Sequence, residues 1–128
     1  MAKSVLLIED DAAIIDIYRT ALAAAGFEVE VITLGKEADK KFENLEKKKG
    51  KIPDLVLLDL ILPDMNGIEI LERLRKKENI KNLPVFIMTN YSDPELEELG
   101  NKLKAEKYIL KAGYTPNKLV ALVKERLG

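Results

Sequence analysis

The amino-acid sequence predicts an α/β domain whose parallel sheet is covered by helices on both faces. Two observations carry this prediction. Short aliphatic runs alternate with amphipathic segments five times along the 128 residues, and several of those runs are apolar at every position. Strands buried on both faces are typical of parallel sheets joined by right-handed helical crossovers. No repeat, linker or low-complexity tract interrupts the alternation, so the sequence predicts one domain spanning residues 1–128.

The first half of the chain contains three of the five predicted strands, Val5–Ile8, Phe27–Ile32 and Leu55–Asp59. A helix is predicted after Asp10 or Asp11, either of which would serve as its cap, and Gly26 ends it. Its inner face is apolar: Ile14, Ile17, Tyr18, Ala21, Leu22 and Ala25. A second, lysine-rich helix is predicted from about Gly35 to Lys49, with Gly50 as its end. Its inward residues are Ala38, Phe42 and Leu45.

The second half adds two strands, Pro84–Thr89 and Lys107–Leu110, and three helices. A loop containing Pro63 and Gly67 leads to a helix with four apolar residues on one side, Ile68, Ile70, Leu71 and Leu74. The segment Ser92–Glu95 supplies a capping side chain and a first-turn proline for the next helix, which carries Leu96, Leu99 and Leu103. Thr115 and Pro116 begin the last helix, whose apolar residues are Leu119, Leu122, Val123 and Leu127.

The composition excludes several kinds of chemistry. Basic and acidic residues nearly balance, 21 against 22, so nothing indicates non-specific binding to nucleic acid or to membranes. Without cysteine and histidine, the chain has no disulfide, no histidine or thiolate metal site, no Ser-His-Asp catalysis and no phosphohistidine of its own. A nucleotide-hydrolase phosphate loop is absent as well. Neither a signal peptide nor a transmembrane segment is recognisable, so a soluble, cytoplasmic protein is expected.

Acidic residues close two of the buried strands. Asp59 ends an apolar run directly, and Glu9 and Asp10 follow the first strand. Because the carboxyl ends of parallel strands meet at the edge of an α/β sheet where ligands bind, we expect these carboxylates to cluster there. Such a cluster needs a cation or a proton to be stable.

Further polar residues follow other strands, and together they resemble those of a known family. Thr89 ends the fourth strand, Lys111 follows the fifth, and a Leu-Pro-Asp-Met-Asn-Gly loop occupies residues 62–67. In order and spacing, these positions and the acidic residues above resemble the receiver domain of bacterial response regulators. The resemblance covers residues 4–127 and implies a flavodoxin-like, doubly wound sheet with strand order 2-1-3-4-5 and five helices.

The resemblance implies a phosphoacceptor and a metal site. Asp59 would accept a phosphoryl group from a partner's phosphohistidine and form an acyl phosphate. Mg²⁺ would be the cofactor, with Asp10 as a direct ligand and Glu9 acting largely through water. Asp59 itself and the backbone carbonyl of Ile61 would complete the protein ligands.

The resemblance also implies a switch. Lys111 and Thr89 would contact the phosphoryl oxygens, so catalysis would consist mainly of positioning and charge neutralisation. Movement of the Thr89 hydroxyl would be coupled to rotation of Tyr108, and this would remodel the face formed by the fourth helix, the fifth strand and the fifth helix. Partial packing of Tyr108 on the sheet explains this residue equally well without a switch.

The sequence is therefore interpreted as a stand-alone receiver of a two-component phosphorelay. It would be a signalling phosphoprotein rather than an enzyme, although it would assist its own phosphorylation and dephosphorylation. The donor would be a histidine kinase or a histidine phosphotransfer protein. No DNA-binding domain follows Gly128, so we expect an unidentified output protein to bind the switched face, with a homodimer on phosphorylation as a further option. Neither nucleic acid nor membrane is expected as a partner.

Two other classes of protein fit parts of the sequence. A degenerate, non-phosphorylated interaction module would keep the fold without the switch, but the complete set of site residues disfavours it. A flavodoxin-like cofactor binder would need a phosphate-cradling loop after the first strand, where Asp10 and Asp11 would repel a phosphate. Taken singly, an aspartate as a cap, Thr89 as a strand residue and Lys111 as a surface cation are the commoner cases. Only their agreement across four strand ends favours a site.

The sequence departs from the family pattern at three places. Asn90 follows Thr89 where the family usually has a very small residue, so it either narrows access or adds a hydrogen bond. Ala112 stands after Lys111 in place of the usual proline, which leaves the isomer of that peptide bond open. The segment Lys47–Pro53 is longer than in compact members and should affect only a surface loop.

Ile61, Asn90 and Tyr91 are expected to line the approach of water to the phosphorylated Asp59. Ile61 and Tyr91 are bulky, and neither is an acid or amide that activates water. Because attacking water would be excluded rather than oriented, the sequence predicts a long-lived phosphorylated form.

Overall fold

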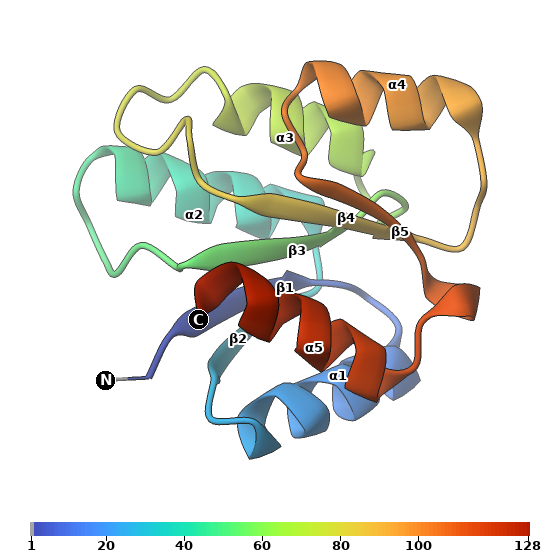
Figure 1. Ribbon diagram of the computed structural model, residues 1–128. Coiled ribbons are helices and arrows are strands. Elements are labelled where there is room, and N and C mark those ends of the chain that lie inside the picture. Colours follow the sequence, from blue (N-terminus) through green and yellow to red (C-terminus); the bar gives the residue numbers. More distant parts are fainter. Residues whose placement is uncertain (1) are drawn as a thin grey trace.

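The predicted alternation of strands and helices is present in the computed structural model, which describes residues 2–128 (Figure 1). The strands are β1 (Ser4–Ile8), β2 (Glu28–Ile32), β3 (Leu55–Asp59), β4 (Val85–Thr89) and β5 (Lys107–Leu110). The helices are α1 (Ala12–Ala24), α2 (Gly35–Glu46), α3 (Gly67–Leu74), α4 (Pro94–Lys102) and α5 (Pro116–Leu127), with a short 3₁₀ turn, η1 (Lys111–Gly113), after β5. Within the described residues, no helix is both long enough and apolar enough to cross a membrane.

The five strands form one parallel sheet in the order β2-β1-β3-β4-β5, which confirms the predicted order. Ile8 pairs with Leu58, and Leu58 pairs with Ile87, so β1, β3 and β4 end at the same edge of the sheet. The polar residues at these three strand ends are therefore neighbours in space, although they are far apart in the chain.

Two apolar cores lie between the sheet and its helices, one on each face (Figure 1). Helices α2, α3 and α4 cover one face, where the buried side chains include Leu6, Phe42, Leu58 and Ile70. Helices α1 and α5 cover the other face, where they include Leu7, Leu22, Phe86 and Val123. Each such side chain contributes about 1.5–3 kcal/mol relative to an exposed position, so these cores hold the sheet edge in place.

Helix α2 ends at Glu46 rather than at the predicted Lys49. Lys48 adopts a φ of +62°, the left-handed conformation that often closes helices. The Lys48 N–H donates to the Leu45 carbonyl (3.0 Å) and the Lys49 N–H to the Asn44 carbonyl (2.8 Å), as in a Schellman motif. These bonds satisfy the last carbonyls of α2, so the helix closes before the glycine that was predicted to end it.

Two large apolar residues of the predicted helices, Ile17 and Leu99, are exposed. Ile17 on α1 is 49% exposed, because Tyr18 and Leu22 face the sheet and Ile17 lies about 100° around the helix from Tyr18. Leu99 on α4 is 42% exposed, and its neighbour Gly100 is the buried residue of that helix. The prediction that Ile17 belongs to the inner face was therefore wrong.

Candidate functional site

A pocket of about 230 Å³ lies at the carboxyl edge of the sheet, where β1, β3, β4 and β5 end. Ten residues line it: Glu9, Asp10, Asp11, Ile14, Asp59, Ile61, Thr89, Asn90, Tyr91 and Lys111. Every site residue proposed from the sequence is among them except Tyr108. The fold thus brings together in one pocket the residues that the sequence placed at the ends of different strands.

Lys111 is a buried cation of this pocket. The residue is 8% exposed, and its Nζ pairs with Glu9 and, at 3.2 Å, with Asp59 Oδ2. Burial lowers the pKa of Lys111, but the hydrogen bond to Glu9 and the charge of Asp59 outweigh burial, so the pKa is raised. Lys111 is therefore not a solvated surface lysine, which was the commoner case for this residue taken singly. The Lys111–Ala112 bond is trans, since no cis peptide bond occurs within residues 2–128.

Glu9 is almost fully buried, and both of its carboxylate oxygens have partners. Oε2 accepts hydrogen bonds from the backbone N–H groups of Asp10 (3.0 Å) and Asp11 (3.1 Å), while Oε1 pairs with Lys111. Burial is the largest influence on Glu9 and raises its pKa, whereas the bonds from Lys111 and Asp11 oppose this rise. The ammonium of Lys111 therefore partly offsets the effect of burial on the pKa of Glu9.

The two aspartates after β1 have different roles. Asp11 is the N-cap of α1, because its Oδ1 accepts from the N–H groups of Ala13 (2.9 Å) and Ile14 (3.0 Å). Asp10 is exposed at the pocket, and its carboxylate belongs to an acidic cluster with Glu9 and Asp59. The sequence left the cap open between the two aspartates, and the structure assigns it to Asp11.

The carboxylates of Glu9, Asp10 and Asp59 fit a divalent cation. One oxygen from each lies within 4.8 Å of the others, near the roughly 4 Å that separates opposite ligands of Mg²⁺. With all three ionised and Lys111 supplying one positive charge, the group has a net charge of −2 (three negative charges against one positive). An all-oxygen donor set with this charge suits a hard cation such as Mg²⁺ rather than a soft one.

Asp59 is oriented by the loop that follows it. The residue is 7% exposed, and its Oδ1 accepts a hydrogen bond from the Ile61 N–H at 3.2 Å. Gly67, the first residue of α3, lies against the backbone of Asp59, since a β-carbon there would be 2.4 Å from the Asp59 carbonyl oxygen. Glycine is therefore required at position 67, because the backbone there lies too close to the backbone of Asp59 to leave room for a side chain.

Thr89 and Tyr108 are linked through the backbone of Tyr91. The buried Thr89 accepts a hydrogen bond at its Oγ1 from the Tyr91 N–H (3.2 Å), and the Tyr108 hydroxyl donates to the Tyr91 carbonyl (3.0 Å). Tyr108 is also half-buried against the core under α2, α3 and α4, and burial raises its pKa. The packing that the sequence offered as one explanation of Tyr108 is therefore present, whereas the coupled movement of Thr89 and Tyr108 stays a prediction.

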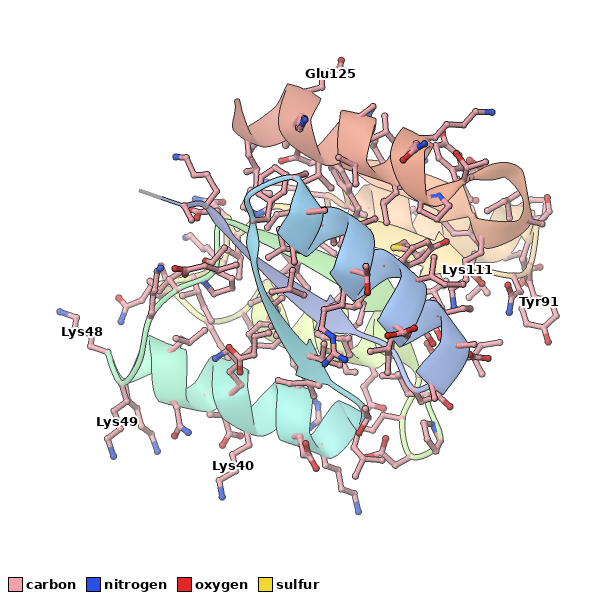
Figure 2. The ribbon with its side chains drawn as sticks, turned by 90° about the horizontal axis from the view of Figure 1, so that it is seen from below. Lys40, Lys48, Lys49, Tyr91, Lys111 and Glu125 are labelled. Carbon is pink, nitrogen blue, oxygen red and sulfur yellow. The ribbon has the colours of Figure 1, made fainter. Side chains whose placement is uncertain are left out.

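Ile61, Asn90 and Tyr91 flank the opening of the pocket. The side chains of Ile61 and Tyr91 are 52% and 57% exposed, and Asn90 is exposed too. Figure 2 shows Tyr91 and Lys111 at one end of the molecule and Lys48 and Lys49 at the other. The segment 47–53, which the sequence predicted to be longer than in compact family members, therefore lies on a surface remote from the pocket.

Two residues of this region were not identified from the sequence. Ile14 lines the pocket from the first turn of α1, and its place in that turn was a usable signal, because the helix begins directly after the carboxyl end of a strand, where ligands bind. Asp64 lies in the loop after β3 and binds the N-terminus of α2. The sequence signal for Asp64 was weak and indirect. Leu34, the N-cap residue of α2, cannot cap the helix with its side chain, so a cap from another segment was needed.

Comparisons with known proteins agree on one family. The family described as "Response regulator receiver domain" matches residues 5–124. The phosphate regulon transcriptional regulatory protein PhoB of Rhizobium meliloti is 33% identical over 127 residues, which cover 99% of this chain and 53% of that protein. The chain spans about half the length of the curated relatives it matches.

Solved structures extend the similarity to three dimensions. A CheY-like response regulator receiver domain protein from Methanospirillum hungatei has a TM-score of 0.85 and 31% identity, covering 99% of this chain and 94% of that one. The phosphorylated cyanobacterial phytochrome response regulator RcpA has a TM-score of 0.79 and 28% identity, covering 98% and 91%. Because almost the whole chain superposes, the similarity includes the sheet edge that carries the pocket.

Proposed function

Because this chain belongs to the response-regulator receiver family of two-component signalling, we propose that it accepts a phosphoryl group on Asp59. A receiver is a signalling domain rather than an enzyme that turns over a separate substrate. The observation that carries the proposal is the buried ammonium of Lys111 beside Asp59 Oδ2, at 3.2 Å, within an acidic cluster suited to a metal ion. A helix cap or a structural ion pair alone would not require an open pocket at this point.

The proposed reaction forms an acyl phosphate. A carboxylate oxygen of Asp59 attacks the phosphorus of a partner's phosphohistidine, so that a P–O bond forms while the P–N bond breaks. The electron pair of the broken bond stays on the imidazole nitrogen, which takes up a proton from solvent. Since residues 1–128 contain no histidine, the phosphohistidine lies outside them, and we propose a histidine kinase or a histidine phosphotransfer protein as the donor.

We assign Mg²⁺ as the cofactor, held by Glu9, Asp10, Asp59 and the backbone carbonyl of Ile61. A bound Mg²⁺ would reduce the repulsion between the carboxylate nucleophile and the anionic phosphoryl group. The charge of −2 that Lys111 leaves uncompensated supports this assignment, because two of the three acids, Glu9 and Asp59, are buried and need counter-charge. Glu9 would act mainly through water, since both of its oxygens already have partners.

Lys111 and Thr89 would contact the phosphoryl oxygens. The Lys111 ammonium is already next to Asp59, so a small side-chain movement would let it pair with the transferred group. The Thr89 Oγ1 accepts its bond from the Tyr91 N–H, which leaves the hydroxyl proton free to donate. Asn90 adds an amide at the pocket, where it either narrows access or donates a further hydrogen bond.

The signal would leave the site through Thr89, Tyr91 and Tyr108. Movement of Thr89 toward the phosphoryl group would disturb the Tyr91 N–H, and Tyr108 binds the carbonyl of the same residue. The face formed by α4, β5 and α5 would then bind an output protein or a second copy of the chain. We propose that residues 1–128 form one receiver domain acting in the cytoplasm, with no direct nucleic-acid or membrane partner.

Incubation with Mg²⁺ and acetyl phosphate, followed by mass spectrometry, tests the proposal. The wild type is expected to gain one phosphoryl group and Asp59→Asn none. Asp54→Asn is a matched control, because Asp54 binds the Ser4 N–H away from the pocket, and it should be modified like the wild type. Modification of Asp59→Asn would refute the assignment. A wild type that neither reacts nor binds beryllofluoride would favour a non-phosphorylated module.

We further propose that the phosphorylated form is long-lived. Ile61 and Tyr91 flank the pocket, and neither side chain carries an acid or an amide that would orient a water molecule toward phosphorus. After removal of the donor, the phosphoryl group should persist for many minutes, and Ile61→Asn, which introduces a water-orienting amide, should shorten that time. Loss from the wild type within seconds would refute this proposal.

A further inference from the structure

We propose that Asp64 is a positioning residue that anchors the loop after Asp59 to the N-terminus of α2 and so holds the Ile61 backbone in place. The inference rests on the function proposed above. Asp64 is itself outside the pocket, so its effect on metal and phosphoryl binding would pass through the loop.

Helix α2 takes its cap from Asp64. The residue at its own N-cap, Leu34, makes no side-chain hydrogen bond to the helix. Instead, Asp64 Oδ1 accepts from the Gly35 N–H at 2.7 Å and Asp64 Oδ2 from the Lys36 N–H at 2.9 Å. A helix leaves its first N–H groups without internal partners, and a negative charge is favourable there. Both oxygens of one carboxylate are thus committed to a helix that precedes the loop in the chain.

Packing also holds the tip of the loop after β3 against the N-terminus of α2. Met65 lies directly against Gly35, where an added β-carbon would be only 2.6 Å from the Met65 Cβ. Met65 is partly buried and packs against the core shared by α2 and α3. Two adjacent loop residues, Asp64 through hydrogen bonds and Met65 through contact, therefore hold the tip on α2.

The base of the loop holds the acceptor carboxylate. Ile61 and Asn66 form an isolated antiparallel bridge, and the Gly67 N–H donates to the Leu60 carbonyl at 2.8 Å. The Ile61 N–H donates to Asp59 Oδ1 at 3.2 Å. The loop is therefore a short hydrogen-bonded segment with the anchor at one end and the oriented carboxylate at the other. A displaced tip would shift the Ile61 backbone and with it the proposed metal ligand.

A cap that only stabilises α2 would behave differently from a positioning residue. Its loss would lower the free energy of unfolding, while the folded protein would bind Mg²⁺ as before. Loss of a positioning residue would weaken Mg²⁺ binding by protein that is still folded, and it would loosen the loop even without metal. These two signatures can be measured separately.

The experiment titrates Mg²⁺ into the wild type, Asp64→Ala, Asp64→Asn and Asp54→Ala, at a temperature where circular dichroism shows the folded state. Asp54 is the matched control, because its carboxylate also accepts from a backbone N–H, that of Ser4 at 2.7 Å, at the amino ends of β1 and β3. Asp64→Ala should bind Mg²⁺ about three- to tenfold more weakly, below the roughly 10–100-fold effect of losing a direct partner of a metal ligand. Asp64→Asn, which keeps one acceptor, should be intermediate, and Asp54→Ala should match the wild type.

Amide hydrogen exchange in the metal-free protein provides a readout that does not involve the metal. The amides of Ile61 and Gly67 should exchange faster in Asp64→Ala and not in Asp54→Ala. Wild-type Mg²⁺ affinity in Asp64→Ala would overturn the inference, and if that variant does not fold, wild-type affinity in Asp64→Asn would do so. A wild type that does not bind beryllofluoride would refute the proposed function instead. Amide hydrogen exchange in Asp64→Ala and Asp54→Ala would still decide whether Asp64 anchors the loop.

Discussion

The segments that follow Asp59 and Thr89 are held to very different degrees. We call residues 60–74, the loop after β3 with α3, the acceptor side, and residues 90–102, the loop after β4 with α4, the hydroxyl side. Helix α3 buries four of its eight residues: Gly67, Ile70, Leu71 and Leu74. Helix α4 buries one of its nine residues, Gly100. The two neighbouring helices therefore differ in how much apolar contact fixes them.

The loops show the same contrast. On the acceptor side, Asp64 binds α2 and Ile61 pairs with Asn66. On the hydroxyl side, Tyr91 is held by Thr89 and by the hydroxyl of Tyr108, which are the two residues proposed to move. Because the free energy needed to displace a segment grows with its buried contacts, we expect the acceptor side to stay fixed while the hydroxyl side responds. A rigid site with one loosely held neighbour is suited to a switch.

Truncating one leucine on each side should give the largest contrast. Leu71→Ala removes a fully buried side chain from α3 and should lower the free energy of unfolding by about 2–5 kcal/mol. Leu99→Ala in α4, where the side chain is 42% exposed, should change it by no more than about 0.5 kcal/mol. Urea denaturation of both variants measures this difference, and equal losses would break the comparison.

Two glycines provide a matched pair of smaller effect. In Gly67→Ala the new β-carbon would lie 2.4 Å from the Asp59 carbonyl oxygen, which belongs to the backbone and cannot move aside, so a loss of about 1–3 kcal/mol is expected. In Gly100→Ala it would meet the terminal carbon of the Ile87 side chain at 2.7 Å, and the higher helix propensity of alanine, about 1 kcal/mol, should offset that contact. Thermal denaturation that ranks Gly100→Ala as the more harmful change would contradict this expectation.

Removing the Tyr108 hydroxyl should affect the hydroxyl side alone. Tyr108→Phe loses the hydrogen bond to the Tyr91 carbonyl, which should lower the free energy of unfolding by about 0.5–1.5 kcal/mol. Amide hydrogen exchange should accelerate in residues 90–95, while the amides of α3 keep wild-type rates. If exchange in residues 90–95 does not change, the bond has no part in holding this loop.

Acid should weaken the acceptor side through Asp64, with the smallest effect of the series. The hydrogen bonds from the Lys36 and Gly35 N–H groups hold the pKa of Asp64 below its ordinary value. A carboxyl with a depressed pKa stabilises the folded state above its unfolded pKa, and this stabilisation is lost as the pH falls through the folded pKa. The difference in melting temperature between the wild type and Asp64→Ala should therefore be constant above about pH 5 and shrink below about pH 4. A difference that grows on acidification would exclude this role.

Features that depend on local patterns could be predicted from the sequence. The strands follow from apolar runs, and the site follows from polar residues at strand ends, because parallel strands place those ends together. Asp59 and Thr89 were found in this way. Predicting that they lie in one pocket required only the correct strand order.

Features that depend on tertiary packing could not be predicted in the same way. The exposure of Leu99 depends on which side of α4 faces the sheet, and Gly100 takes the buried position. The early end of α2 depends on a left-handed conformation at Lys48, a residue type that rarely adopts it. The two hydrogen bonds between Asp64 and α2 join residues that are 29 and 28 positions apart in the chain. No local pattern in either segment specifies the other.

The central claim is that phosphorylation chemistry at Asp59 moves the hydroxyl side and leaves the acceptor side in place. Amide hydrogen exchange of the wild type and Asp59→Asn, each with Mg²⁺ and with or without beryllofluoride, tests it most directly. We expect beryllofluoride to change exchange in residues 90–102 and at Tyr108 of the wild type, with α3 unchanged and no response in Asp59→Asn. A response that persists in Asp59→Asn, or one that is as large in α3 as in α4, would contradict the claim.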